Sequence, residues 1–131
     1  PVCAIPQHKD IISLGFVSDE DKFNGIMGSK ALILPSKFES LSISVLEAMT
    51  LSKPVIVNGI CDVLRGHCTK SNGGLFYKNY FEFEGCLNYM LTHDAEYEIM
   101  CKNARKYVDD YFQWDDIMRK FDKVIDGISN E

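Results

Sequence analysis

The sequence predicts one α/β domain with a mainly parallel sheet that is covered by helices on both faces. Short apolar runs of strand length alternate with segments in which apolar residues recur at helical spacing. Parallel strands joined through helices use right-handed crossovers, which lay the helices over the faces of the sheet. At 131 residues and 46% apolar composition, the chain can bury one such core and is too short for a second domain.

Three apolar runs in the first half of the chain predict buried parallel strands. They occupy residues 10–16 (Asp-Ile-Ile-Ser-Leu-Gly-Phe), 31–35 (Ala-Leu-Ile-Leu-Pro) and 54–57 (Pro-Val-Ile-Val). A last short strand is expected at residues 75–77, directly after the turn cluster Ser-Asn-Gly-Gly at 71–74.

Helices are expected between the first three strands. One begins at the acidic capping pattern of residues 18–21. The other begins near Ser42 and is stopped by Pro54, because proline cannot continue a helix. The apolar residues on one face are Phe23, Ile26 and Met27 in the first helix and Ile43, Leu46 and Met49 in the second.

Three more helices are expected in the second half of the chain. One is capped by Asn79, one starts near Glu96 and the last starts at Trp114. Their apolar stripes are Phe83, Leu87 and Met90, then Tyr97, Met100, Ala104, Tyr107 and Val108, and finally Ile117, Phe121, Val124 and Ile128.

The charge pattern argues against nucleic acid as a partner. The formal net charge is -5, and the 14 basic residues are scattered, so they form no stripe that would follow a phosphate backbone. No apolar run reaches the roughly 20 residues that a membrane span requires.

Cysteine and histidine usage predicts neither disulfides nor a metal site. The five cysteines are odd in number and include no C-x-x-C pair, which is typical of reduced, buried thiols in a cytosolic protein. His8, His67 and His93 lack metal-ligand spacing, and we expect them at the surface or in loops.

The loops that follow the predicted strands are the expected place for a ligand. In an open parallel sheet, ligands bind beyond the carboxyl ends of the strands, here at residues 16–18, 36–42 and 58–61. A helix that begins near Ser42 has amides in its first turn without intrahelical partners, and such amides form a site for phosphate.

Two carboxylates flank this helix start. Glu39 precedes it, and Glu47 lies about five residues into the helix, roughly 7 Å along its axis. A carboxylate only accepts hydrogen bonds and can accept from two neighbouring sugar hydroxyls at once. The residue types alone also allow an ordinary interpretation, with a solvated loop carboxylate, a surface ion pair, and Ser40 and Ser42 as simple N-caps.

Several motifs follow one another along the chain in a characteristic order. They are Leu-Gly-Phe-Val-Ser at 14–18, Glu39 and Glu47 with seven residues between them, Ser-Lys-Pro-Val-Ile at 52–56, Asn-Gly-Gly-Leu-Phe at 72–76, and Phe-Gln-Trp at 112–114. Over residues 10–124 this order resembles the C-terminal, donor-binding domain of group 1 (family 4-like) glycosyltransferases of the two-domain GT-B fold. The resemblance implies a Rossmann-like three-layer domain.

The resemblance also implies a role for each candidate site residue. Glu39 would be the catalytic residue, beside the hydroxyls of the donor sugar, and Glu47 would bind the ribose hydroxyls. The other substrate-binding residues would be Ser40, Leu41, Ser42 and Ile43 at the sugar and distal phosphate, and Phe16 and Val17 at the base. The segment Ser-Leu-Ser at 40–42 replaces the Gly-Phe-Gly of many relatives, which leaves the identity of the donor sugar open.

For the whole protein, the resemblance implies transfer of a hexosyl group with retention of configuration. The donor would be a nucleotide-diphosphate sugar and the acceptor a glycan or a lipid-linked sugar, as in bacterial surface polysaccharide synthesis. No metal or other cofactor is implied. The protein would be cytoplasmic, with peripheral association of the full-length enzyme with the inner face of the membrane.

Residues 1–131 are expected to form only part of the donor domain. The family's acceptor-binding N-terminal domain and its upstream cationic segment have no counterpart in the sequence, so we expect the isolated fragment to be inactive. Two other functions stay open: a nucleotide-sugar epimerase of the same fold, and a non-catalytic flavodoxin- or receiver-like nucleotide-binding domain. A receiver needs a phosphorylatable aspartate where this chain has Pro35 and Ser36.

Overall fold

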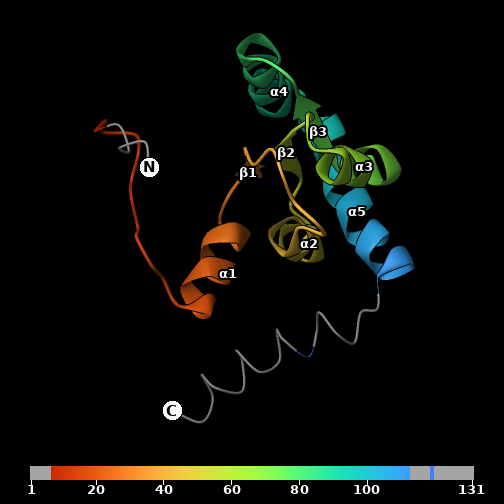
Figure 1. Ribbon diagram of the computed structural model, residues 1–131, viewed down its shortest axis with the longest axis horizontal. Coiled ribbons are helices and arrows are strands. Elements are labelled where there is room, and N and C mark those ends of the chain that lie inside the picture. Colours follow the sequence, from red (N-terminus) through yellow and green to blue (C-terminus); the bar gives the residue numbers. More distant parts are fainter. Residues whose placement is uncertain (1–6, 113–118, 120–131) are drawn as a thin grey trace.

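A three-stranded parallel sheet lies at the centre of the computed structural model, which describes residues 7–112 and residue 119 (Figure 1). The strands have the order β1-β2-β3, and Val55 of β2 lies opposite Leu32 of β1 and Gly74 of β3. The elements are α1 (Asp19–Met27), β1 (Leu32–Leu34), α2 (Ile43–Thr50), β2 (Val55–Asn58), α3 (Asp62–Ser71), β3 (Gly74–Tyr77), α4 (Tyr80–Thr92) and α5 (Asp94–Tyr111).

The capping residues predicted from the sequence start two of the helices. The Ser18 hydroxyl accepts a hydrogen bond from the Asp21 amide at 3.1 Å at the start of α1. The Asn79 side chain accepts one from the Glu82 amide at 3.0 Å at the start of α4. Both contacts satisfy amides that would otherwise lack a partner at a helix start.

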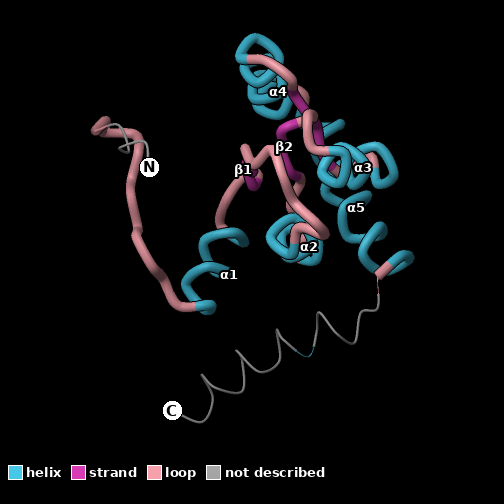
Figure 2. The backbone as a smooth tube through the Cα atoms, viewed as in Figure 1, coloured by secondary structure: helices cyan, strands magenta, loops and turns pink. Residues whose placement is uncertain are grey.

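Helices cover both faces of the sheet, which gives the three layers predicted from the sequence (Figures 1 and 2). Successive side chains of a strand point to opposite faces, so Val55 and Val57 belong to one hydrophobic cluster and Ile56 to another. The first cluster joins β2 to α1, α2, α3 and the second half of α5. The second joins β2 to α4 and the first half of α5.

Helix α5 packs unusually close to the turn before β3. A Cβ atom added to Gly73 would lie 2.7 Å from the Ala104 Cα, so only glycine lets the two backbones approach this closely. Asn72 ends α3 in the left-handed conformation, with a φ of 54°. From the same helix, the Arg105 guanidinium donates to the Thr50 carbonyl at the end of α2, at 2.8 Å. Helix α5 thus holds the end of α2 and the turn into β3.

The predicted strand at residues 10–16 does not form. Its apolar side chains are exposed, Gly15 turns the chain with a φ of 62°, and only an isolated bridge joins His8 to Ile11. Figure 2 shows this segment as a loop that runs away from the sheet. An apolar run becomes a buried strand only when a neighbouring strand and a covering layer are available, and no other described strand lies beside this one.

Two further differences concern helices. Helix α3 was not predicted, because charged and polar residues dominate it and its buried face rests on Leu64, His67, Cys68 and Ser71. The predicted helix that starts at Trp114 lies outside the described residues.

The described cysteines are all free thiols, as expected. Cys61, Cys68 and Cys86 are buried, and Cys101 is partly buried. Burial raises the pKa of the Cys68 thiol to about 12. Among the described residues, no helix combines the length and apolar character needed to cross a membrane.

Candidate functional site

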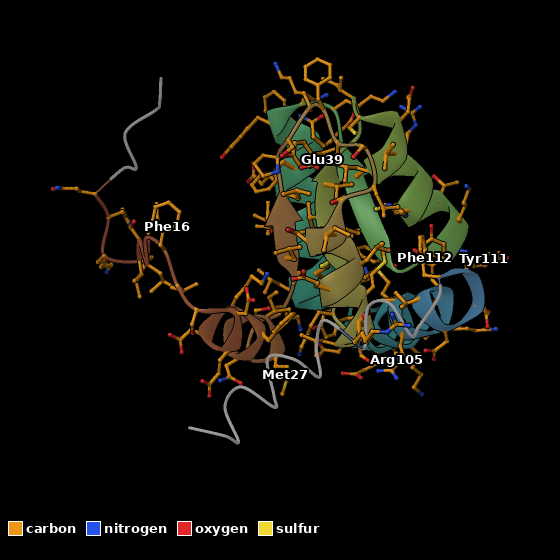
Figure 3. The ribbon with its side chains drawn as sticks, turned by 60° about the horizontal axis from the view of Figure 1, so that its bottom comes forward. Phe16, Met27, Glu39, Arg105, Tyr111 and Phe112 are labelled. Atoms are coloured by element: carbon orange, nitrogen blue, oxygen red, sulfur yellow. The ribbon has the colours of Figure 1, made fainter. Side chains whose placement is uncertain are left out.

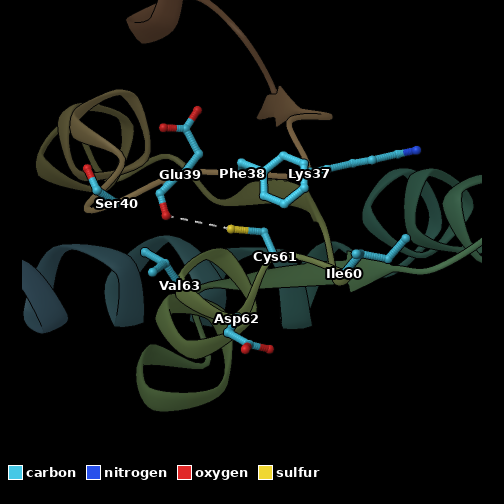
Figure 4. Close-up of a pocket in the computed structure, with 8 residues that line it drawn as sticks. All are labelled: Lys37, Phe38, Glu39, Ser40, Ile60, Cys61, Asp62 and Val63. Atoms are coloured by element: carbon cyan, nitrogen blue, oxygen red, sulfur yellow. Dashed lines mark hydrogen bonds between the residues drawn. The ribbon is translucent and has the colours of Figure 1, made fainter.

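The loops that follow β1 and β2 meet at the carboxyl edge of the sheet and enclose an open pocket of about 530 Å³ (Figure 4). The residues that line it are Lys37, Phe38, Glu39 and Ser40 from the first loop and Ile60, Cys61, Asp62 and Val63 from the second loop and the start of α3. Two of the three segments singled out in the sequence, 36–42 and 58–61, therefore come together where a parallel sheet binds ligands.

Asn58, the last residue of β2, ties the two loops to each other. Its side-chain amide donates to the Pro35 carbonyl at 3.2 Å, and its side-chain oxygen accepts from the Ile60 amide at 3.0 Å. Asn58 is 8% exposed. A buried amide with both its donor and its acceptor engaged fixes the relative position of the segments it joins.

Glu39 lies at the mouth of the pocket, half-buried. Its backbone carbonyl receives a weak contact from the Cys61 thiol at 3.9 Å. In Figure 4 its carboxylate points away from Cys61 and from α3. The backbone of Glu39 thus contacts the second loop, while its carboxylate makes no contact with that loop in Figure 4.

Helix α2 begins at Ser42 in a strained conformation. The φ of Ser42 is 65°, which costs a non-glycine residue on the order of 1 kcal/mol or more. Ser42 is 5% exposed, and its hydroxyl has no hydrogen-bond partner among the described residues. The first-turn amides of α2 also lack intrahelical partners. The sequence predicted a phosphate at this helix start, and a phosphate accepts hydrogen bonds from such donors. Ser42 stands where many relatives have glycine, yet it adopts the left-handed conformation that glycine adopts most easily.

The start of α3 gives the pocket a second set of amides. Cys61 is its N-cap, so the amides of Asp62 and Val63 face the pocket side of the helix start, where the dipole is positive. The Arg65 guanidinium donates to the Gly59 carbonyl at 2.7 Å and to the Asp62 carboxylate at 2.6 Å. This contact offsets the charge that Asp62 brings to the helix start.

His67 of α3 supports the first loop from below. It is 6% exposed; its Nε2 lies 2.7 Å from the Leu41 carbonyl oxygen, and its Nδ1 lies 2.8 Å from the Tyr107 hydroxyl of α5. Its pKa is lowered mainly by burial; the Leu41 carbonyl opposes this shift and Lys70 adds to it. The expectation of a surface or loop histidine is therefore wrong for His67, whereas His8 and His93 are exposed as expected.

Glu47 lies apart from this pocket. Its side chain is 5% exposed, and its Oε2 is 3.0 Å from Nζ of Lys22 in α1. It is not among the pocket-lining residues. The structure thus places the two glutamates of the motif in different surroundings: Glu39 lines an open pocket, and Glu47 is buried and pairs with the partly exposed Lys22.

The remaining predicted residues differ in the same way. Ser40 lines the pocket. The side chains of Leu41 and Ile43 are exposed and do not line it, so only their backbone groups remain as candidates for contact with a ligand. Phe16 and Val17 are exposed, and Figure 3 shows Phe16 well away from Glu39. The structure does not bring these two residues to the pocket.

Sequence reasoning missed the residues that hold the loops. Asn58 was within a segment of interest, but its hydrogen bond to the Pro35 carbonyl joins residues 23 positions apart in the sequence. His67 joins Leu41 and Tyr107 across 26 and 40 residues. Its burial could have been inferred from its position beside Cys68 on the inner face of α3, but only if that helix had been predicted.

Comparisons with known proteins relate the chain to glycosyltransferases. The family described as glycosyl transferases group 1 matches residues 6–107. An uncharacterized glycosyltransferase of Methanocaldococcus jannaschii is 27% identical over 115 residues, which cover 87% of this chain and 29% of that protein. The chain therefore spans less than a third of the length of this relative. No solved structure matches the chain.

Proposed function

Because the chain belongs to the glycosyl transferases group 1 family, we propose that it forms the donor-binding domain of a retaining hexosyltransferase. The observation that carries this proposal is the pocket at the carboxyl edge of the sheet, where Glu39 lies between the starts of α2 and α3. The family favours glycosyl transfer over the epimerase and receiver alternatives.

The donor in this proposal is a nucleotide-diphosphate sugar. Its distal phosphate would accept hydrogen bonds from the first-turn amides of α2 and from the Ser42 hydroxyl, which has no other described partner. The amides near Ser40 and Leu41 would add donors from the loop, and Lys37 brings a positive charge to the pocket. Negative charge that develops on the leaving diphosphate is stabilised most by donors already held in place.

Glu39 is the proposed catalytic residue, through contact with the sugar. Its carboxylate would accept hydrogen bonds from two sugar hydroxyls and so orient the ring. The acceptor oxygen would replace the diphosphate oxygen at the anomeric carbon on the same face, and the proton of the acceptor hydroxyl would pass to the leaving diphosphate. We expect no metal or other cofactor in this reaction.

Glu47 is proposed to bind the ribose. Its carboxylate lies 3.0 Å from Nζ of Lys22 and has further lone pairs that would accept hydrogen bonds from the ribose hydroxyls. Contact of Phe16 and Val17 with the base requires their segment to approach the loop from its present extended position.

The acceptor is proposed to be a glycan or a lipid-linked sugar held by an N-terminal domain of a longer protein. We propose that the full-length enzyme acts in bacterial surface polysaccharide synthesis, at the cytoplasmic face of the membrane. The first experiment should identify the nucleotide base and the hexose of the donor.

A titration of the full-length protein with UDP, GDP, ADP and their sugars tests the donor role. We compare the wild type with Glu39→Gln and Glu47→Gln. Glu39→Gln should weaken binding of one nucleotide sugar about tenfold and leave its free nucleotide unchanged, because Glu39 contacts only the sugar. Glu47→Gln should weaken both ligands about equally.

Lys22→Met is the matched control for Glu47→Gln. It breaks the same ion pair but keeps the carboxylate, so its nucleotide affinity should stay within about threefold of the wild type. Equal losses in the two variants would mean that the ion pair, and not a ribose contact, explains Glu47. Binding of no nucleotide sugar by the wild type would refute the donor role.

A further inference from the structure

The buried His67 side chain contacts the loop that carries Glu39 without lining the pocket itself. Its Nε2 lies 2.7 Å from the Leu41 carbonyl oxygen, two residues after Glu39 and one before Ser42. On its other side, Nδ1 lies 2.8 Å from the Tyr107 hydroxyl. The ring also packs against Phe112, with 5.8 Å between ring centroids. Both polar atoms of the ring are thus engaged.

The chemistry of the two partners determines where the proton on His67 lies. A carbonyl oxygen only accepts, so Nε2 must carry the hydrogen that is donated to Leu41. In the neutral ring Nδ1 is then an acceptor, and the Tyr107 hydroxyl can donate to it. Burial lowers the pKa of His67, which favours the neutral ring.

This hydrogen bond restricts the peptide group between Leu41 and Ser42. The peptide is planar and trans, so a fixed carbonyl direction also fixes the direction of the Ser42 amide on the opposite side. Ser42 is held at a φ of 65°, a conformation that persists only when surrounding contacts enforce it. His67 supplies such a contact at the residue before it.

We propose that His67, oriented by Tyr107, is a positioning residue that holds the loop of residues 39–42 in the conformation that binds the donor. The inference rests on the proposed donor role of that loop. His67 acts through the Leu41 carbonyl and not by contact with the ligand. It therefore adds a second layer behind Glu39 that links α3 and α5 to the candidate site.

The test uses three substitutions in the full-length protein. His67→Gln puts an amide donor near the position of Nε2, His67→Asn puts its amide near that of Nδ1, and His67→Phe keeps a ring without nitrogen. We measure kcat, the KM for the nucleotide sugar that binds best, and the KM for the acceptor. Hydrogen exchange is followed at the amides of residues 39–43.

We expect rescue by glutamine only. His67→Gln should keep the donor KM within about threefold of the wild type, whereas His67→Asn and His67→Phe should raise it about tenfold, because the Leu41 carbonyl loses its donor. The acceptor KM should not change in any variant. Exchange in residues 39–43 should accelerate in the asparagine and phenylalanine variants. Equal effects of glutamine and asparagine would overturn the proposal, because His67 would then only fill space.

Nitrogen NMR of the wild type gives a result that does not depend on how the variants fold. The proposal requires the proton on Nε2 and an unprotonated Nδ1 near neutral pH, and a proton on Nδ1 alone overturns it. This measurement and the hydrogen exchange need no donor. If no nucleotide sugar binds, the proposed function fails, while these two measurements still decide whether His67 holds the loop.

Discussion

Two segments predicted to serve one ligand differ sharply in how the protein supports them. The loop of residues 36–42 is held from behind by Asn58, which binds the Pro35 carbonyl before it, and by His67, which binds the Leu41 carbonyl within it. The segment of residues 7–17 is exposed throughout, and its bridge and polar contacts join His8 to Asp10 and Ile11 within the segment itself. The segment predicted to bind the phosphate and the sugar is therefore supported by neighbouring elements, and the segment predicted to bind the base is not.

A sequence pattern locates the motif residues of both segments, but it does not indicate which segment the rest of the protein supports. Both segments carry motif residues at the expected positions, but only the loop of residues 36–42 is held by buried side chains, Asn58 and His67, that bind backbone carbonyls in or beside it. Preorganised geometry comes from supporting residues distant in sequence, and these determine whether a motif residue is ready to bind. Four measurements test whether the two segments differ in this way.

The largest effect is expected from Gly73→Ala. The added Cβ would meet the Ala104 backbone at 2.7 and 2.8 Å, so α5 must move, and Tyr107 with it. We expect a loss of about 3 kcal/mol in the free energy of unfolding, measured by urea denaturation. Gly85→Ala is the control, because its Cβ meets nothing within 4 Å and alanine favours the helix by up to about 1 kcal/mol. A neutral Gly73→Ala would show that α5 is not packed this closely.

Asn58→Ala should have the next largest effect. It removes the donor to Pro35 and the acceptor from Ile60 in a buried position, and we expect a loss of about 2 kcal/mol of stability in the same assay. Asn88→Ala, exposed on α4, should change stability by less than about 0.5 kcal/mol. Similar values for the two variants would mean that the loops are not joined through Asn58.

The pH dependence of stability should be smaller and should trace to His67. Burial keeps its folded-state pKa below the ordinary histidine value of 6.5, so in this range the unfolded chain binds more protons than the folded protein. The contribution of His67 is therefore complete above about pH 6.5 and is lost as the pH falls toward the folded-state pKa. Lys70 on the same helix and Tyr107 on α5 face the ring.

The measurement compares urea midpoints of the wild type and His67→Gln through this range. The wild type should lose up to about 1.4 kcal/mol more per pH unit than the variant. Parallel pH profiles would indicate that His67 titrates alike in the folded and unfolded states.

The smallest effect is expected from Phe16→Ala. Because Phe16 is exposed, the variant should be within about 0.5 kcal/mol of the wild type in urea denaturation. Phe23→Ala, on the buried face of α1, should cost about 3 kcal/mol. A clear loss in Phe16→Ala would show that the segment of residues 7–17 is packed in solution, and the contrast between the two regions would disappear.

The parts of the fold that follow local rules were predictable. Periodicity and capping residues such as Ser18 and Asn79 predicted α1, α2, α4, α5 and three strands. Residues 10–16 have the composition of a strand, but pairing depends on a neighbour that composition does not encode. Helix α3 was missed because polar residues dominate its sequence, and its buried residues alternate apolar Leu64 and Cys68 with polar His67 and Ser71.

The candidate site was predictable to a similar extent. Strand ends located the loops that form the pocket, and the motif located Glu39. The burial of Glu47 beside Lys22 and the support from His67 depend on contacts between elements distant in sequence. The order of residues along the chain does not reveal which of these contacts form.

Helix α5 contributes Tyr97 and Met100 to the hydrophobic cluster on one face of the sheet and Ala104 and Val108 to the cluster on the other. A helix shared in this way couples the two layers thermodynamically, since neither can open fully while α5 remains docked. Unfolding should therefore be cooperative, with amides in β2, α2 and α4 exchanging through one global opening. A small domain with two thin cores behaves as one folding unit because a single helix belongs to both.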